Sequence, residues 1–290
     1  MDKAILKTII YYDIFNFPLK AWEIQKWLIG REASLNQIEK RLQKLIKNSK
    51  ISASRGYYYL PGKSSLVKKR LAKELTSKHH LSTARNISLL FKLIPWVKLV
   101  GISGSLSVMG SSEEDDIDLF IITSQNRIWI SRLLILLLTS LTGLRRKRRE
   151  KILQATGKIC INLILEENSL EQSKKNIYVA HEVLQMRLLW QRTQIYSQFL
   201  HNNSWAFKYL PNWKTSIIEI QDPKKKSKIK FSPKDNVLLA ALEVLSKKLQ
   251  LKIMGSPDKS EKIESGALYF HPEDKGVKVL EQYKKRITQL

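Results

Sequence analysis

The amino-acid sequence predicts a protein of the α/β (α+β) class, in which a small mixed β-sheet is flanked by an N-terminal group of helices and by a helical C-terminal region. Two observations predict this class. Short strand-forming runs alternate with helical patterns between residues 97 and 170, which is typical of a small sheet covered by helices. On either side of this segment, apolar residues recur mainly at helical spacing. A length of 290 residues suits about two domains.

The chain is strongly basic, with 51 Lys+Arg against 26 Asp+Glu and a formal net charge of +25. This charge predicts polyanionic partners such as nucleic acid, nucleotide phosphates or anionic lipid. Cys160 is the single cysteine, which excludes an intrachain disulfide framework and a Cys-rich zinc site. We therefore expect a reducing compartment, and because the N-terminus has no secretory pattern we expect a cytoplasmic protein.

The N-terminal segment, residues 1–62, begins with three predicted helices. Apolar residues at helical spacing predict the first two helices over 4–14 and 19–29. Ser34 is then a suitable N-cap for a third helix, and Gln37 three residues later completes a capping box.

A short predicted hairpin with Arg55 at its turn follows the third helix, and this order of elements resembles a winged helix-turn-helix. In DNA-binding members of that group the third helix enters the major groove and the hairpin touches the backbone. Lys40, Arg41, Lys44 and Arg55 are the residues that suit such phosphate contacts with DNA or RNA. Winged helices also serve as packing or partner-binding modules, so both roles stay open.

The segment of residues 63–96 is predicted to hold a basic helical linker and then the first helix of the core. This helix spans 81–93, and Pro95 ends it. The core then occupies residues 97–170. Its predicted elements are a strand from Val97 to Ile102, a strand from Ile117 to Thr123, a helix from Arg127 to Leu144 and a strand from Ile159 to Leu165.

The remaining segment, residues 171–290, predicts a helical region that covers the core. The helical patterns span 176–199, 202–213, 235–254 and 267–290, and a low-complexity patch from Lys224 to Lys230 predicts a solvated loop. If these helices pack beside the sheet, Arg187 and Arg192 come within reach of a triphosphate there; otherwise they are ordinary surface cations, which is the default interpretation.

The most apolar stretch, Leu133 to Leu144, is a candidate for membrane contact. It falls short of the roughly 20 residues that a membrane span needs, so a buried helix is the prediction. The basic run Arg145 to Arg149 behind it leaves weak peripheral association with anionic lipid as an alternative.

Five acidic residues gather within six positions of this basic chain, between Glu113 and Asp118. Because side chains alternate along a strand, Asp116 and Asp118 point to the same face, where two carboxylates suit Mg²⁺. Twelve residues earlier a strand ends in Gly104-Ser105. Glycine allows close approach of the backbone to a phosphate, and the serine hydroxyl can donate a hydrogen bond to it.

This pattern resembles the DNA polymerase beta-like nucleotidyltransferase superfamily, in which Gly-Gly or Gly-Ser after a strand precedes Asp-x-Asp in the next strand by about ten residues. The resemblance covers about 25 residues and implies a nucleotidyltransferase. Such an enzyme moves a nucleoside monophosphate from an NTP to an acceptor hydroxyl with two Mg²⁺ ions. The resemblance also implies that Asp116 and Asp118 hold the metal and that Gly104 and Ser105 hold the triphosphate.

The chain departs from the family pattern at the third carboxylate, which active members carry on a neighbouring strand. The matching strand offers Asn162 at that place, and an amide can contribute a carbonyl to a metal but cannot take a proton. Glu166 and Glu167 follow at the strand end as possible substitutes.

Two function classes therefore remain. The first is an enzyme that transfers nucleotide to an unidentified acceptor, which is RNA, a protein or a small molecule. The second is a catalytically weak or inactive nucleotide-binding regulator whose winged helix binds DNA or a protein partner.

Overall fold

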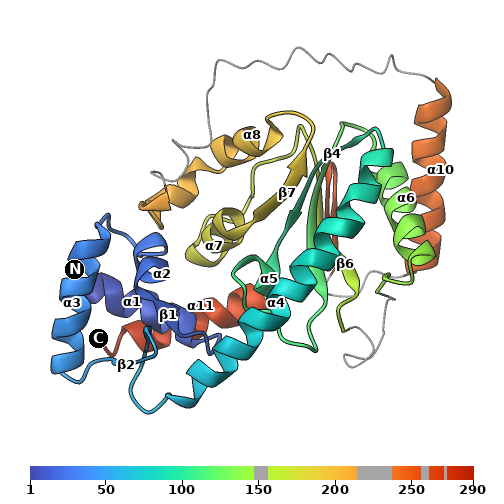
Figure 1. The fold of residues 1–290 in the computed structure, drawn as a ribbon. Helices are drawn as coiled ribbons and strands as arrows, with labels where there is room; N and C mark the ends of the chain where they lie inside the picture. Colours follow the sequence, from blue (N-terminus) through green and yellow to red (C-terminus); the bar gives the residue numbers. More distant parts are fainter. Residues whose placement is uncertain (147–155, 214–236, 256–260, 271–272) are drawn as a thin grey trace.

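The computed structural model of the chain describes residues 1–146, 156–213, 237–255, 261–270 and 273–290 (Figure 1). It confirms the α+β class, with helices around one three-stranded and one six-stranded sheet. The helices are α1 (Asp2–Asp13), α2 (Ala21–Lys26), α3 (Leu35–Lys47), α4 (Ser65–Leu90), η1 (Phe91–Leu93), α5 (Gly104–Ser107), α6 (Ile128–Leu141), α7 (Ile177–Gln185), α8 (Ile195–Asn202), η3 (Ser204–Lys208), α10 (Val237–Met254) and α11 (Glu273–Ile287).

The small sheet belongs to the N-terminal elements and has the order β1-β3-β2. Its strands are antiparallel: β1 (Leu19–Lys20), β2 (Ser52–Ser54) and β3 (Tyr57–Tyr59). The capping box at α3 forms as predicted, since the Ser34 hydroxyl accepts from the Gln37 N–H and the Gln37 side chain accepts from the Ser34 N–H. The predicted second helix is shorter than expected, because Leu19 and Lys20 pair with β3 before α2 begins.

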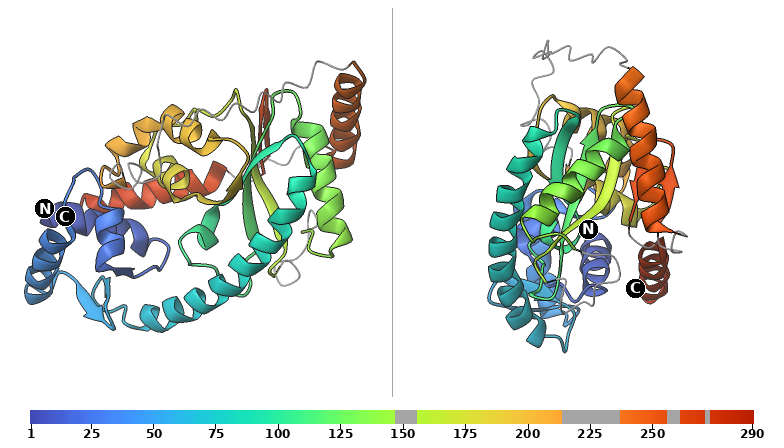
Figure 2. Two further views of the ribbon diagram at one scale, coloured as in Figure 1. Left: turned by 45° about the horizontal axis from the view of Figure 1, so that its top comes forward. Right: turned by 90° about the vertical axis from the view of Figure 1, so that its right-hand side faces the viewer.

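A single helix, α4, replaces the predicted linker and separate following helix. It spans 26 residues and connects the N-terminal elements to the large sheet (Figure 2). No proline or glycine interrupts residues 65–90, so nothing in the sequence ends the helix midway. It ends where η1 and Pro95 lead into the first strand of the large sheet.

The large sheet has the strand order β7-β4-β5-β6-β9-β8. The β5–β6 pair is parallel and the others are antiparallel. The strands are β4 (Val97–Ile102), β5 (Ile117–Thr123), β6 (Ile159–Glu166), β7 (Arg187–Gln191), β8 (Lys262–Glu264) and β9 (Ala267–Tyr269). The three central strands match the predicted β runs.

The edge strands are the part of the sheet that the sequence prediction lacks. The predicted helix over 176–199 is divided into α7, β7 and α8, and β7 pairs with β4. The predicted helical segment over 267–290 begins instead with β9, which forms a hairpin with β8 through the positive-φ residue Gly266. Strands β8 and β9 have three residues each, and β7 carries three apolar residues in a row, so none of them shows a period of two. The low-complexity patch lies outside the described residues.

The N-terminal elements share one apolar core with α7, α8, η3 and α11. Tyr11 of α1 stacks on His181 of α7 at 4.2 Å between ring centroids and meets Tyr283 of α11 at 5.4 Å. Asp13, which is 5% exposed, pairs with Lys63 at 2.6 Å and with Arg286 of α11 at 2.5 Å. Residues from the two ends of the described chain therefore complete the same core, and the termini lie near each other (Figures 1 and 2).

Helices α6 and α10 lie side by side at the other end of the molecule (Figure 1). Glu243 of α10 accepts hydrogen bonds from the backbone N–H groups of Trp129 and Ile130, and Gln250 donates to the Trp129 carbonyl. The polar side of α10 is thus its buried side. Most of its large apolar residues are exposed in the described part of the chain, whereas Leu239 and Leu251 are half-buried and Met254 is buried; the exposed ones are Val237, Leu238, Leu242, Val244, Leu245, Leu249 and Ile253.

No helix among the described residues has the length and the apolar composition that a bilayer crossing requires. Helix α6 ends at Leu141, and the basic run predicted behind it lies mostly outside the described residues. The peripheral lipid contact predicted there stays untested.

The buried His181 predicts a specific acid sensitivity. Burial lowers its pKa from 6.5 to about 3, so the folded state binds fewer protons than the unfolded state between these values. The contribution of the neutral His181 to the unfolding free energy is therefore present above about pH 6.5 and is lost progressively as the pH falls below that value. Between pH 7 and pH 5 we expect the wild type to lose about 2 kcal/mol more unfolding free energy than His181→Phe, as measured by urea unfolding. Parallel pH profiles in the two proteins would contradict this role.

Candidate functional site

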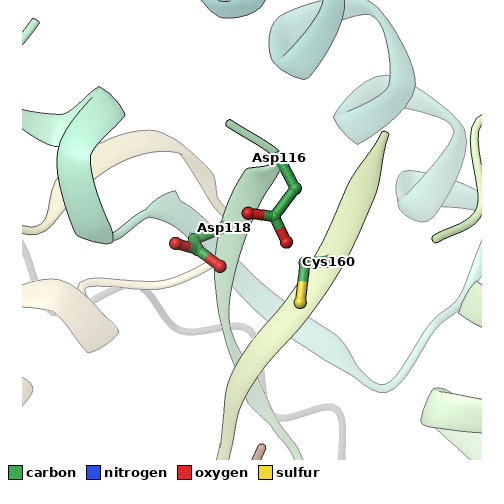
Figure 3. Close-up of side chains that lie close together, drawn as sticks. All are labelled: Asp116, Asp118 and Cys160. Atoms are coloured by element: carbon green, nitrogen blue, oxygen red, sulfur yellow. The ribbon is translucent and has the colours of Figure 1, made fainter. Parts of the chain in front are cut away.

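The residues of the predicted phosphate and metal site meet at one end of the large sheet. Strand β4 ends at Ile102, and α5 begins directly afterwards with Gly104. Asp116 precedes β5 and Asp118 is its second residue. Figure 3 shows both carboxyl groups beside the thiol of Cys160, which comes from the neighbouring strand β6. One ligand atom from each of these three side chains lies within 4.8 Å of the other two.

Gly104 is packed against Asp118 and has the conformation that glycine tolerates best. Its φ is +62°, and a Cβ at this position would collide with Asp118 Oδ2. The Ser103 N–H also donates to the Asp118 carbonyl at 3.0 Å, which fixes the turn against β5. The structure therefore brings together Gly104 and Asp118, which were predicted to bind phosphate and metal.

Gly104→Ala tests this close packing. We expect a loss of about 1–2 kcal/mol in unfolding free energy from the left-handed backbone alone, with a further loss because the methyl group displaces the Asp118 carboxylate. Urea unfolding measures the change. Gly143→Ala is the matched control, since Gly143 has a similar φ of +71° and nothing within 4 Å of a Cβ. Equal losses in the two variants would contradict the close packing.

Asp115 holds the loop between α5 and β5. Its Oδ2 accepts from the Ser105 hydroxyl at 2.9 Å and from the Ser112 N–H at 2.9 Å. The Ser105 hydroxyl, predicted to donate to a phosphate, is thus directed to Asp115 and must turn to reach a ligand. The acid next to the predicted pair has a structural task that the sequence analysis did not assign.

Cys160 rather than Asn162 is paired with Asp118 in the parallel β5–β6 register. A register shift between Leu119 and Phe120 leaves Asn162 opposite no residue of β5. The Asn162 amide donates to the Ser103 hydroxyl at 2.9 Å. It therefore supports the turn before Gly104, and its predicted catalytic role stays a prediction.

Cys160 contributes a neutral thiol. Burial, reinforced by the charges of Asp118 and Asp116, raises the pKa of the thiol well above its usual value. A protonated sulfur is a poor ligand for a hard cation. The two carboxylates are therefore the metal-binding part of this cluster.

Arg146 forms an ion pair with Asp116, and its Nη1 also lies 3.8 Å from the Cys160 sulfur. Burial is the largest single influence and favours a lower pKa for this guanidinium, but Asp116 and Cys160 together outweigh it and raise the pKa. A cation is therefore already placed where Asp116 would bind a metal. Arg146 belongs to a basic run distant in sequence from the acids, so no local pattern predicts this pairing.

Glu166 and Glu167 lie too far away to replace a third carboxylate. Glu166 pairs with Thr123, the last residue of β5, whereas Asp118 pairs with Cys160. Five residues of strand separate the two places, roughly 16 Å. Glu167 forms an ion pair with Lys98 at that far end.

Arg187 lies at the same end of the sheet as Gly104, because it pairs with Ile102 in the β4–β7 register. Burial, followed by the charge of Arg85, lowers the pKa of Arg187. Burial and the charge of Arg187 likewise lower the pKa of Lys26. Arg187 is thus close enough to both Arg85 and Lys26 for their charges to repel. Arg192, the other cation considered from the sequence, is beyond Gln191 at the opposite end.

The residues predicted to contact nucleic acid are on the surface of the N-terminal elements. Lys40, Arg41 and Lys44 are exposed on α3, and Arg55 is exposed at the hairpin turn with a φ of +52°. Arg41 lies 3.8 Å from the Asp2 carboxylate. Their exposure agrees with either role considered for this unit, so nucleic-acid contact stays a prediction.

The donor set fits Mg²⁺. This ion takes oxygen ligands, commonly one or two carboxylates, and completes its shell with waters and substrate phosphates. Asp116 and Asp118 supply two carboxylates at a sheet end that is neither fully buried nor fully exposed.

Comparisons with known proteins identify no family. No protein-family model and no curated protein matches the chain. A solved structure, "Crystal structure of the toxin-antitoxin with AMP-PNP", is similar over 47% of this chain and 94% of that chain, with 19% sequence identity and a TM-score of 0.28.

Proposed function

We propose that the protein is a Mg²⁺-dependent nucleotidyltransferase that moves a nucleoside monophosphate from an NTP to an acceptor hydroxyl. The observation that carries the proposal is the packing of the Gly104 turn directly against Asp118, next to Asp116, at one end of the sheet. Asp116 and Asp118 would hold Mg²⁺. When bound, the metal supplies charge neutralisation for the triphosphate and for the oxygens that attack and leave.

In this reaction the main role of the protein is to position the NTP and the acceptor. The acceptor oxygen bonds to the α-phosphorus while the bond from that phosphorus to the bridging oxygen breaks, and pyrophosphate leaves. Gly104 lets the backbone approach the phosphates, and Ser105 donates to one of them after it releases Asp115. The proton of the acceptor hydroxyl goes to solvent or to the substrate, because Asn162 cannot accept a proton and the Cys160 thiol is already protonated. We therefore expect slow turnover.

The cations near the site support binding of a polyanion. Burial and the charge of Arg85 lower the pKa of Arg187, and burial and the charge of Arg187 lower the pKa of Lys26, so a triphosphate would relieve repulsion around Arg187. Arg146 is a further candidate, because a guanidinium released from Asp116 can bind a phosphate in bidentate fashion.

Labelled NTPs test the proposal directly. The full-length protein is incubated with each α-labelled NTP, Mg²⁺ or Mn²⁺ and a cell extract, and the label is then followed into RNA, protein and small molecules. We expect the label in one acceptor class, with no transfer when EDTA is present. Absence of transfer from all four NTPs would contradict the enzymatic proposal.

A second candidate function is a nucleotide-binding regulator without turnover. The pairing of Arg146 with Asp116 and the thiol in place of a third carboxylate favour it. In this case the N-terminal segment, residues 1–62, binds DNA through α3.

A DNA-binding assay tests the regulator. We expect replacement of Lys40, Arg41 and Lys44 by Gln to lower the salt dependence of duplex binding, the slope of log K against log salt, by about 3. Replacing the exposed Lys68, Lys69 and Lys78 of α4 is the matched control. Equal slopes for both triple variants would rule against α3 as the contact surface.

A further inference from the structure

A cavity opens at the end of the large sheet opposite to Asp116 and Asp118. Its volume is about 500 Å³, and it is lined by η1, the chain around Pro95, the start of β4 and the end of β7. Strand β4 runs from this cavity at Val97 to the Gly104 turn, so about six residues of strand, roughly 20 Å, separate the two places. The cavity is thus distinct from the proposed transfer site.

Two tryptophans and three cations dominate the lining: Trp96, Trp190, Lys92, Lys98 and Arg192. No acidic residue lines the cavity among the described residues. Lys98 is paired with Glu167, whereas Lys92 and Arg192 have no acidic partner among the residues that the structure describes. Aromatic rings and positive charge therefore occur together in a cavity of ordinary ligand-binding size.

The indole of Trp190 and the guanidinium of Arg192 are held in place. Trp190 Nε1 donates to the Ser88 carbonyl at 2.7 Å. Arg192 donates to the backbone carbonyls of Val97 at 2.9 Å, Lys92 at 2.5 Å and Ile94 at 3.3 Å. These acceptors carry no formal charge, so they orient the guanidinium without neutralising it. Arg192 lies 5.7 Å and Lys92 lies 5.8 Å from the Trp190 ring centroid.

We propose that this cavity binds an unpaired nucleobase together with its phosphate, as carried by single-stranded RNA or DNA or by a free nucleotide. Stacking on indole rings accepts any base, because every base has a π-face, and cations beside the rings attract the phosphate. The exposed Lys92 side chain is the group that moves aside from Trp190 when a base enters. The proposal is independent of the nucleotidyl transfer proposed above.

The experiment must separate stacking from the general attraction of a basic protein for phosphates. The full-length protein is titrated against a short fluorescent oligothymidylate and against the same strand with abasic residues. Both titrations contain EDTA and about 0.2 M salt, where phosphate contacts alone weaken steeply. EDTA removes the metal-dependent contribution of the Asp116 and Asp118 site.

We expect the oligothymidylate to bind roughly tenfold more tightly than the abasic strand. Trp96→Leu should reduce this ratio to about one, and Lys92→Gln should weaken both strands without changing it. Trp22→Leu and Lys69→Gln are the controls, because Trp22 is 51% exposed and both residues lie outside the cavity. Equal affinity for the two strands in the wild type overturns the proposal, as does a ratio that Trp96→Leu leaves unchanged.

Competition with thymidine monophosphate distinguishes the two sources of the base. Displacement of the oligonucleotide at equal nucleotide concentration assigns the cavity to free nucleotides. Retention of the oligonucleotide assigns it to strands, in which neighbouring phosphates add contacts to the exposed lysines. Both outcomes require the base-dependent binding described above.

Discussion

Replacing both Asp116 and Asp118 by Asn should abolish the stabilisation that an NTP with Mg²⁺ gives to the wild type, and with it any nucleotide transfer. A ligand at a hundredfold excess over its Kd adds about 2.7 kcal/mol to the unfolding free energy. In a protein of this size that corresponds to a rise of roughly 5–10 °C in Tm. The double variant keeps the shape of both side chains but removes the two charges that bind the metal, so the expected rise is close to zero.

The control for this variant lies in the same acidic stretch. Glu113 and Glu114 are exposed, and replacing both by Gln removes the same net charge without touching the carboxylate cluster. Differential scanning fluorimetry with and without Mg²⁺-NTP measures all three proteins. An undiminished rise in the Asp116 and Asp118 variant would remove the metal site from consideration, whereas loss in both variants would indicate a general effect of charge.

Arg70→Met should destabilise the protein by about 3–5 kcal/mol, the usual cost of breaking a buried ion pair. Arg70 is 3% exposed, and its Nη2 lies 2.9 Å from Glu23 and 3.2 Å from Glu74. Its Nη1 donates to the Met109 carbonyl at 2.5 Å, and its guanidinium lies over the Phe17 ring. One side chain of α4 thus joins the N-terminal elements to the loop after α5.

Most of that cost comes from the carboxylate left behind. Burial raises the pKa of Glu23 even with Arg70 beside it, and removal of the guanidinium leaves this charge uncompensated. Adding Glu23→Gln to Arg70→Met should therefore recover part of the lost unfolding free energy, as measured by urea unfolding. Lys69→Met, at the exposed neighbouring position, should change stability by less than about 0.5 kcal/mol. A similar small change in Arg70→Met would contradict the buried network.

The sequence predicted those parts of the fold whose signals are local. The capping box of α3 and the central strands β4, β5 and β6 depend on short patterns, and the structure has them. Strand β7 was predicted as helix because its apolar residues continue the helical spacing of α7. Only its pairing with β4 makes it a strand. Tertiary contacts decide such short segments, and the sequence alone does not contain them.

The sequence predicted the residues of the candidate site that are close in the chain, but not those that come from neighbouring segments. The relation of Gly104 to Asp116 and Asp118 follows from the chain order and from alternation, both of which the sequence displays. The neighbour from β6 depends on the register and on the bulge at Asn162, which a count of residues cannot supply. Arg146 reaches Asp116 because the chain after α6 forms a bridge with Ile159 at Arg145, a contact between segments that no local pattern reveals.

The core shared by α1, α7 and α11 has a consequence for biosynthesis. A ribosome adds about 5–20 residues per second, so α1 emerges on the order of tens of seconds before α11, which packs on it. During that interval Tyr11 lacks Tyr283 and Asp13 lacks Arg286. The N-terminal helices therefore reach their final packing only after the C-terminal helix has been synthesised.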